Sequence, residues 1–186
     1  MNAMLEKGRW AHGDLPANVS LGIGTLIRGP KCFSRFKSQV EDAIIVGKGC
    51  SLDGVHFALN PGAKLVIGDH CAISGSLILA ELQVTIGNCV VMGWNVVISD
   101  SDFHPTDPDE RRLDAIACSM LPDGPRRVYP SKPVTIGDNV YVGHNVTILK
   151  GVTVGAGAWI EPGAMVTRDV PPHARVLGNP AVVQEG

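Results

Sequence analysis

Apolar residues recur at every sixth position along most of this chain. In the last third, the first position of each six-residue unit is Ile or Val, and the fifth is small or β-branched. The first positions are Ile136, Val142, Ile148, Val154, Ile160 and Val166. Gly, Asn and Asp, which favour turns, separate many of these short apolar pieces. This pattern fits neither the spacing of an amphipathic helix nor the alternation of a long strand.

The same spacing extends through the first half of the chain. Further units begin at Val46, Leu52, Ile67, Ile73 and Leu79 and, after one extra residue at Thr85, at Ile86, Met92 and Ile98. The segment 21–27 is expected to form a first, irregular coil. Short strands separated by bends, three to a turn, close a coil of about eighteen residues. The chain is therefore predicted to be all-β, a parallel β-helix with first-position side chains inside and small fifth-position residues, including Cys50 and Cys71, at the inner corners.

The pattern is interrupted once and stops near both ends. About residues 104–133 are charged and rich in proline, and we predict an extended loop there. Residues 1–18 are predicted to form an irregular N-terminal cap, 19–171 the β-helix, and 172–186 a C-terminal cap. Pro171 and Pro172 cannot donate to a strand ladder, so they end the last coil. Caps of this kind protect the unpaired edges of the terminal coils.

Composition narrows the class of protein. Aromatic residues make up 5% of the chain against 45% hydrophobic residues, so the core must consist of Val, Ile, Leu and Ala. A net charge of −2 without a basic run argues against nucleic acid or an anionic membrane as partner. The sequence has no long uncharged apolar stretch and no signal-peptide core near its start, which predicts a cytoplasmic protein. Its five cysteines form no CxxC motif, and we expect them to be reduced.

The interruption opens with the segment SDSDFHPTDPDERR, which places His104 where the chain leaves the β-helix. A histidine has an ordinary pKa near ~6.5 and can remove a proton at neutral pH, provided a partner orients its other nitrogen. Asp100 and Asp102 are near in sequence, and a backbone carbonyl would also serve. From the residues alone, His104 could equally be a solvated loop residue.

Three segments resemble the hexapeptide-repeat acyltransferases, in particular sugar O-acetyltransferases of the maltose and galactoside type. They are the histidine segment, the repeat block over residues 132–172, and the sequence GNPA at 178–181. The resemblance covers about residues 18–183 and implies a left-handed coil, a property that periodicity cannot reveal. It also implies transfer of an acetyl group from acetyl-CoA to a hydroxyl of a sugar or similar small acceptor, with His104 as general base. Glu81 would contact sugar hydroxyls.

The resemblance further implies a homotrimer with acetyl-CoA in grooves between subunits, and an exposed apolar face on a monomer would favour such assembly. The implied groove residues are His144, Pro162, Thr167, Arg168, Arg175, Asn179 and Pro180. His144 could instead be an ordinary turn histidine, and GNPA a plain terminal turn. Relatives often carry basic residues after this turn, whereas this chain has Val182, Val183, Gln184 and Glu185, which leaves Arg168 and Arg175 for the phosphates.

Two other functions fit this sequence, and a third function found on the same fold does not. An N-acyltransferase acting on an amino-sugar nucleotide would use the same histidine, and a non-catalytic β-helix could serve as an assembly or binding module. The zinc-dependent γ-class carbonic anhydrases use three histidines, two of them five residues apart. The six histidines of this chain include no such pair, and catalytic zinc needs at least three protein ligands, so we expect no metal.

Overall fold

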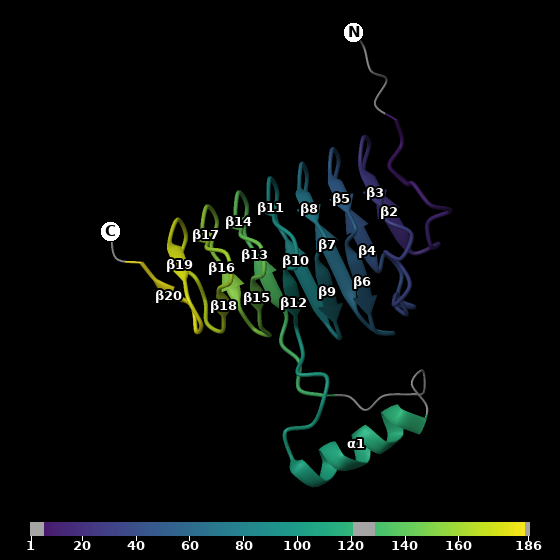
Figure 1. Ribbon diagram of the computed structural model, residues 1–186. Coiled ribbons are helices and arrows are strands. Elements are labelled where there is room, and N and C mark those ends of the chain that lie inside the picture. The colour runs from purple at the N-terminus through teal and green to yellow at the C-terminus, as the bar shows by residue number, and fades with distance from the viewer. Residues whose placement is uncertain (1–5, 121–128, 185–186) are drawn as a thin grey trace.

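A computed structural model describes residues 6–120 and 129–184 of the 186-residue chain. Its short strands wind into a prism with three faces, each a parallel sheet, and the termini lie toward opposite ends (Figure 1). Apart from β19 and β20, every described strand pair is parallel. The predicted all-β parallel β-helix is therefore confirmed, and it is consistent with the left-handed coil that the resemblance implied.

Sheet 1 contains the strands that follow the first corner of each coil. In spatial order they are β1 (Arg9–Trp10), β3 (Leu26–Arg28), β5 (Ser51–Asp53), β8 (Ala72–Ser74), β11 (Val91–Met92), β14 (Tyr141–Val142), β17 (Trp159–Ile160), β19 (Arg175–Leu177) and β20 (Val182–Val183). Thus β1 lies within the segment predicted as an irregular cap and pairs with β3.

Sheets 2 and 3 complete the prism. Sheet 2 consists of β2 (Val19–Leu21), β4 (Ile44–Val46), β7 (Lys64–Ile67), β10 (Gln83–Ile86), β13 (Val134–Ile136) and β16 (Thr153–Val154). Sheet 3 consists of β6 (His56–Leu59), β9 (Leu77–Ala80), β12 (Val97–Ser99), β15 (Thr147–Ile148) and β18 (Met165–Val166). Within a coil the chain passes from sheet 2 to sheet 1 to sheet 3, and then back to sheet 2 of the next coil.

First-position residues fill the interior, with one exception. Ile136, Val142 and Ile148 are at most 1% exposed, and Cys50 and Cys71 are buried at their corners as predicted. The assignment of Leu79 to a first position was wrong. Ile78 points inward in its place and pairs with Phe57 and Ile98, because this coil takes five residues rather than six from Ile73 to the next interior position.

The fourth position of the unit makes the corners possible. Asn95, Asn139 and Asn145 hold φ angles of 57°, 54° and 58°, in the left-handed region. Asparagine is among the few residues other than glycine that adopt this region readily. The Gly and Asn content that predicted turns therefore places a sharp bend after each short strand.

The sequence predicts an extended loop over about residues 104–133, but part of this segment is helical. It contains helix α1 (Pro108–Met120), which lies away from the prism, below β12, β9 and β6 in the view of Figure 1. The Asp107 carboxylate caps this helix by accepting hydrogen bonds from the backbone N–H groups of Asp109 (3.0 Å) and Glu110 (2.9 Å). Pro108 suits the first helical position. No helix among the described residues is long and apolar enough to span a bilayer.

Candidate active site

The excursion leaves the prism at the corner between sheet 3 and sheet 2, and Asp100 fixes this point. Asp100 has no exposed surface, and its carboxylate accepts hydrogen bonds from the backbone N–H groups of Glu81 (2.8 Å), Leu82 (2.7 Å) and Gln83 (2.8 Å). Its carbonyl accepts one from the Lys132 N–H at 2.8 Å, on the returning segment. Burial raises the pKa of the Asp100 carboxyl, while these N–H donors lower it. Asp100 thus holds the two ends of the excursion together.

His104 is oriented by a residue that the sequence did not single out. Its Nδ1 lies 2.6 Å from Oδ2 of Asp114, which projects from the middle of α1 and is buried. The Tyr129 hydroxyl hydrogen-bonds to the other carboxylate oxygen of Asp114. The His104 side chain is 53% exposed. Because Nδ1 is engaged by a carboxylate, Nε2 is the nitrogen left to exchange a proton with a substrate.

The backbone before His104 is held in an uncommon conformation. Phe103 has a φ of 56°, a region that bulky residues rarely adopt. Its N–H donates to Oγ of Ser101 at 3.1 Å, and Pro105 is buried on the other side of the histidine. Such conformations persist only where the surroundings impose them, often at functional sites. Here the local conformation presents the imidazole to α1.

The predicted partners of His104 have other contacts. Asp102 forms an ion pair with Lys150 one coil further on, and Asp100 binds the corner backbone as described. Glu81 accepts a hydrogen bond from the Asn60 side-chain amide and lies in the corner before the one where the excursion begins. In this structure Asp114, rather than Asp100 or Asp102, therefore contacts Nδ1 of His104. Glu81 lies in the adjoining corner.

A sequence signal for α1 was available. Asp107, Pro108 and Glu110 have the spacing of a helix N-terminus, with a capping residue, a first-position proline and an acid three residues after the cap. That signal predicts the helix. It does not predict which of its acids reaches His104, because that depends on how the helix packs.

The predicted donor residues lie on both edges of sheet 3, in the coils after His104. His144 and Pro162 are exposed in successive corners between sheets 1 and 3, and exposed Asn179 and Pro180 lie in the turn from β19 to β20, whose backbone bonds to Met165 on β18. Thr167 and Arg168 are exposed at the opposite edge, in the corner between sheets 3 and 2. Arg175 lies on sheet 1 and is ion-paired with Glu161. The structure thus places most of these residues along the two edges of sheet 3. The strand that precedes His104, β12, belongs to the same sheet.

Within the described residues, no three His, Cys, Asp or Glu side chains are grouped so that they could hold a metal ion. The titratable groups gathered at the site are the imidazole of His104, the carboxylate of Asp114, the Tyr129 hydroxyl and the Cys118 thiol, whose Sγ lies 3.9 Å from Oδ1 of Asp114.

Comparisons with known proteins agree with this geometry. The family model described as bacterial transferase hexapeptide (six repeats) matches residues 133–168. Nodulation protein L of Rhizobium meliloti (strain 1021) is 35% identical over 129 residues, which are 69% of this chain and 63% of the relative. The chain belongs to the hexapeptide-repeat transferase family. It spans less than two thirds of the length of that curated relative.

Two solved structures extend the comparison beyond sequence. A hexapeptide-repeat acetyltransferase from Vibrio cholerae O1 biovar eltor, complexed with acetyl-CoA, has a TM-score of 0.57 and 27% identity over 76% of this chain and 67% of that one. A maltose O-acetyltransferase from Clostridium difficile 630 has a TM-score of 0.53 and 28% identity over 82% of this chain and 70% of that one. Both are similar to this chain in fold and in sequence.

Proposed function

We propose that the protein is an acetyl-CoA-dependent O-acetyltransferase that acetylates a hydroxyl of a sugar or a similar small acceptor. The observation that carries the proposal is the His104–Asp114 contact at the root of the excursion. A half-exposed imidazole held by a buried carboxylate is the arrangement that a general base requires. The relatives named for acetyl transfer support the same reaction class.

His104 would act through Nε2. As the acceptor oxygen attacks the thioester carbonyl carbon, Nε2 takes the hydroxyl proton, and Asp114 stabilises the imidazolium through Nδ1–H. The carbon–sulfur bond then breaks, and the imidazolium returns its proton to the leaving sulfur. The products are an acetyl ester and free CoA thiol. Asp114 is thus a positioning residue, because it acts through His104.

The donor would lie along the borders of sheet 3. His144, Pro162, Asn179 and Pro180 provide one edge, and Thr167 and Arg168 the other. Since Arg175 is engaged with Glu161 and Arg168 forms no ion pair among the described residues, Arg168 is the better partner for a CoA phosphate.

Acceptor-dependent release of CoA thiol tests this function. We expect wild-type protein to release thiol from acetyl-CoA when a suitable hydroxyl acceptor from a sugar panel is present, well above the rate without acceptor. Calorimetry should show acetyl-CoA binding. Failure to bind acetyl-CoA would favour a non-catalytic β-helix, and turnover confined to amino sugars would favour the N-acyltransferase.

We also infer a homotrimer with active sites between subunits. Leu113, Ile116 and Met120 form a stripe on one side of α1 and are 47%, 46% and 75% exposed. Because α1 stands away from its own prism, a second copy of the chain is the surface that would cover this stripe (Figure 1). Partly exposed Val97 and Met165 on the outer face of sheet 3 offer a further apolar contact.

Light scattering should give three times the 19.6 kDa of one chain. A double variant, Leu113→Glu with Ile116→Glu, should shift the protein toward smaller species, because it places charges on the apolar stripe. Ala115→Glu, on the opposite side of α1, adds a charge without touching the stripe and should leave the mass unchanged. A monomeric wild type would contradict the trimer, and an unchanged double variant would remove α1 from the interface.

A further inference from the structure

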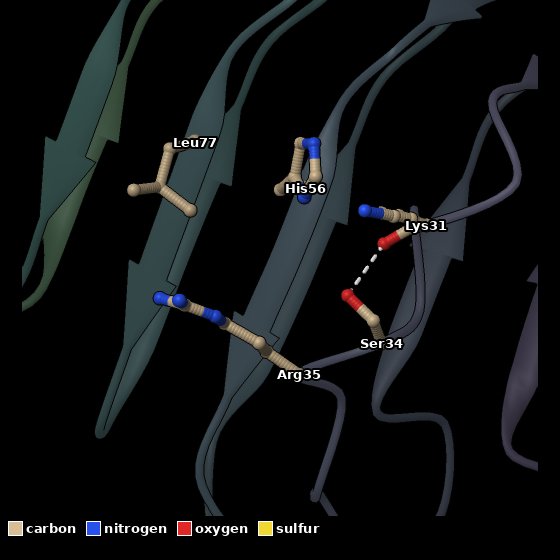
Figure 2. Close-up of a pocket in the computed structure, with 5 residues that line it drawn as sticks. All are labelled: Lys31, Ser34, Arg35, His56 and Leu77. Carbon is tan, nitrogen blue, oxygen red and sulfur yellow. Dashed lines mark hydrogen bonds between the residues drawn. The ribbon is translucent and has the colours of Figure 1, made fainter.

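A second polar site lies on sheet 3, away from His104. It is an open pocket of about 690 Å³ lined by Lys31, Ser34, Arg35, His56 and Leu77 (Figure 2). His56 and Leu77 are paired neighbours on β6 and β9, and the other three residues belong to the segment between β3 and β4. None of these residues was singled out by the sequence.

The backbone of this segment is fixed against the edge of sheet 3. The carbonyl of Cys32 accepts a hydrogen bond from the Phe57 N–H, and the Lys37 N–H donates to the Leu59 carbonyl, both at 2.8 Å. The Phe33 ring packs on Phe57 with 5.2 Å between ring centroids. The pocket wall is thus held in place by contacts on both sides of Ser34 and Arg35.

The pocket is basic and contains no acid. The Lys31 side chain points toward His56, and the Arg35 side chain extends across β6 toward β9, the strand of Leu77 (Figure 2). Within the described residues neither cation forms an ion pair, whereas Lys48, Lys150 and Arg175 all do. Two cations that line one pocket without an acidic partner give it a positive potential, which attracts an anion. A guanidinium and an ammonium are each well suited to bind a carboxylate or a phosphate.

The order of strands places this pocket on the acceptor side of the reaction. In sheet 3 the order is β18, β15, β12, β9, β6, and the excursion with His104 follows β12. The proposed donor residues lie in the coils of β15 and β18 and beyond, while the pocket lies on β9 and β6. At a strand spacing of about 4.8 Å, β6 is roughly 10 Å from β12, the strand that leads to His104.

We propose that this pocket binds an anionic group of the acceptor, so that the substrate is a hydroxyl compound carrying a carboxylate or a phosphate. Lys31 and Arg35 bind the charge, and the hydroxyl to be acetylated points toward His104. The inference rests on the proposed transferase function for its direction, but the anion site can be tested without turnover.

Binding gives the first test. Calorimetry with inorganic phosphate and, separately, with glucuronate should show affinity of the wild-type protein for at least one of them, and the stronger ligand identifies the anion class. The double variant Lys31→Gln with Arg35→Gln should lose roughly tenfold or more of that affinity, since each lost contact is a charged hydrogen bond. Lys64→Gln removes an exposed charge from sheet 2 and should bind like wild type.

Kinetics give the second test, with a neutral hexose, its uronic acid and its 6-phosphate compared as acceptors. The wild type should favour one of the charged acceptors by about tenfold or more in kcat/KM, and the double variant should raise the KM for it while the KM for acetyl-CoA stays the same. Equal use of neutral and charged acceptors, without anion binding, would overturn the pocket and leave the transferase function standing. Anion binding without any turnover would leave the pocket standing and overturn the transferase function. A raised KM for acetyl-CoA alone would assign the cations to the donor and overturn the proposal.

Discussion

Replacing His104 with alanine is expected to lower kcat by about 10²–10⁴-fold, because the variant has no group to take the acceptor proton. The His104 side chain contributes to the excursion and not to the prism, so the fold should persist. Acetyl-CoA affinity should also persist, since the proposed donor residues lie in later coils. Steady-state kinetics with both substrates saturating, together with calorimetry of acetyl-CoA binding, would measure these effects.

A matched variant separates loss of the base from loss of any histidine. His70 occupies a fourth-position corner between sheets 2 and 1, with a φ of 58°, and asparagine adopts that conformation elsewhere in the prism. His70→Asn should therefore retain wild-type turnover. If His104→Ala kept its activity with the true acceptor within a few fold of wild type, His104 would not be the base.

Asp114→Asn should have the second largest effect, a loss of about 100-fold or more in kcat/KM. The amide keeps the size of the carboxylate but cannot stabilise the imidazolium, and it can favour the wrong tautomer of His104. The loss should fall on kcat, with the KM values for both substrates unchanged, because the carboxylate charge is needed only as the imidazolium forms. A purely structural role for Asp114 would instead lower the melting temperature and raise the KM values.

Tyr129→Phe provides the control for this experiment. It removes the hydroxyl that bonds to Asp114 while leaving the contact between His104 and Asp114 in place. We expect a loss of only a few fold in kcat. Equal losses of kcat in Asp114→Asn and Tyr129→Phe, with equal falls in melting temperature, would show that the buried pair serves to hold the helix rather than to assist the base.

The prism could be predicted from sequence because each coil repeats the same residue types at the same positions. A large apolar residue such as Ile136 or Ile148 must point inward once per face, and a residue such as Asn139 must turn the chain afterwards. The error at Leu79 has a local cause. Five residues separate Ile73 from Ile78, against six between Met92 and Ile98, so the interior position moved to Ile78.

The active site could be predicted only in part, because its geometry depends on segments outside the repeat. His104 stood out where the repeat breaks, and its place at the root of the excursion follows from that. Its partner did not stand out, since Asp114 is ten residues away on a helix whose packing no periodicity fixes. Asp100 and Asp102 were nearer in sequence, yet the backbone turns them toward a corner and toward Lys150.

The basic pocket could not be predicted from the sequence, for a similar reason. Lys31 and Arg35 belong to an irregular segment, and His56 lies on a strand in the following coil. They converge only because Cys32 and Lys37 pair with the edge strand β6. Charges scattered along the sequence predict solvated surface, and only the register of that segment brings them together.

Analysis of the acetylated product tests the central claim most directly. Wild-type protein and His104→Ala would be incubated in parallel with acetyl-CoA and a hydroxyl acceptor, and the acceptor analysed by mass spectrometry before and after mild alkali. We predict that the wild type adds a single acetyl group that alkali removes, as expected for an ester, and that the variant forms far less of it. An alkali-stable amide, or a product formed equally well without His104, would contradict an O-acetyltransferase that uses this histidine as its base.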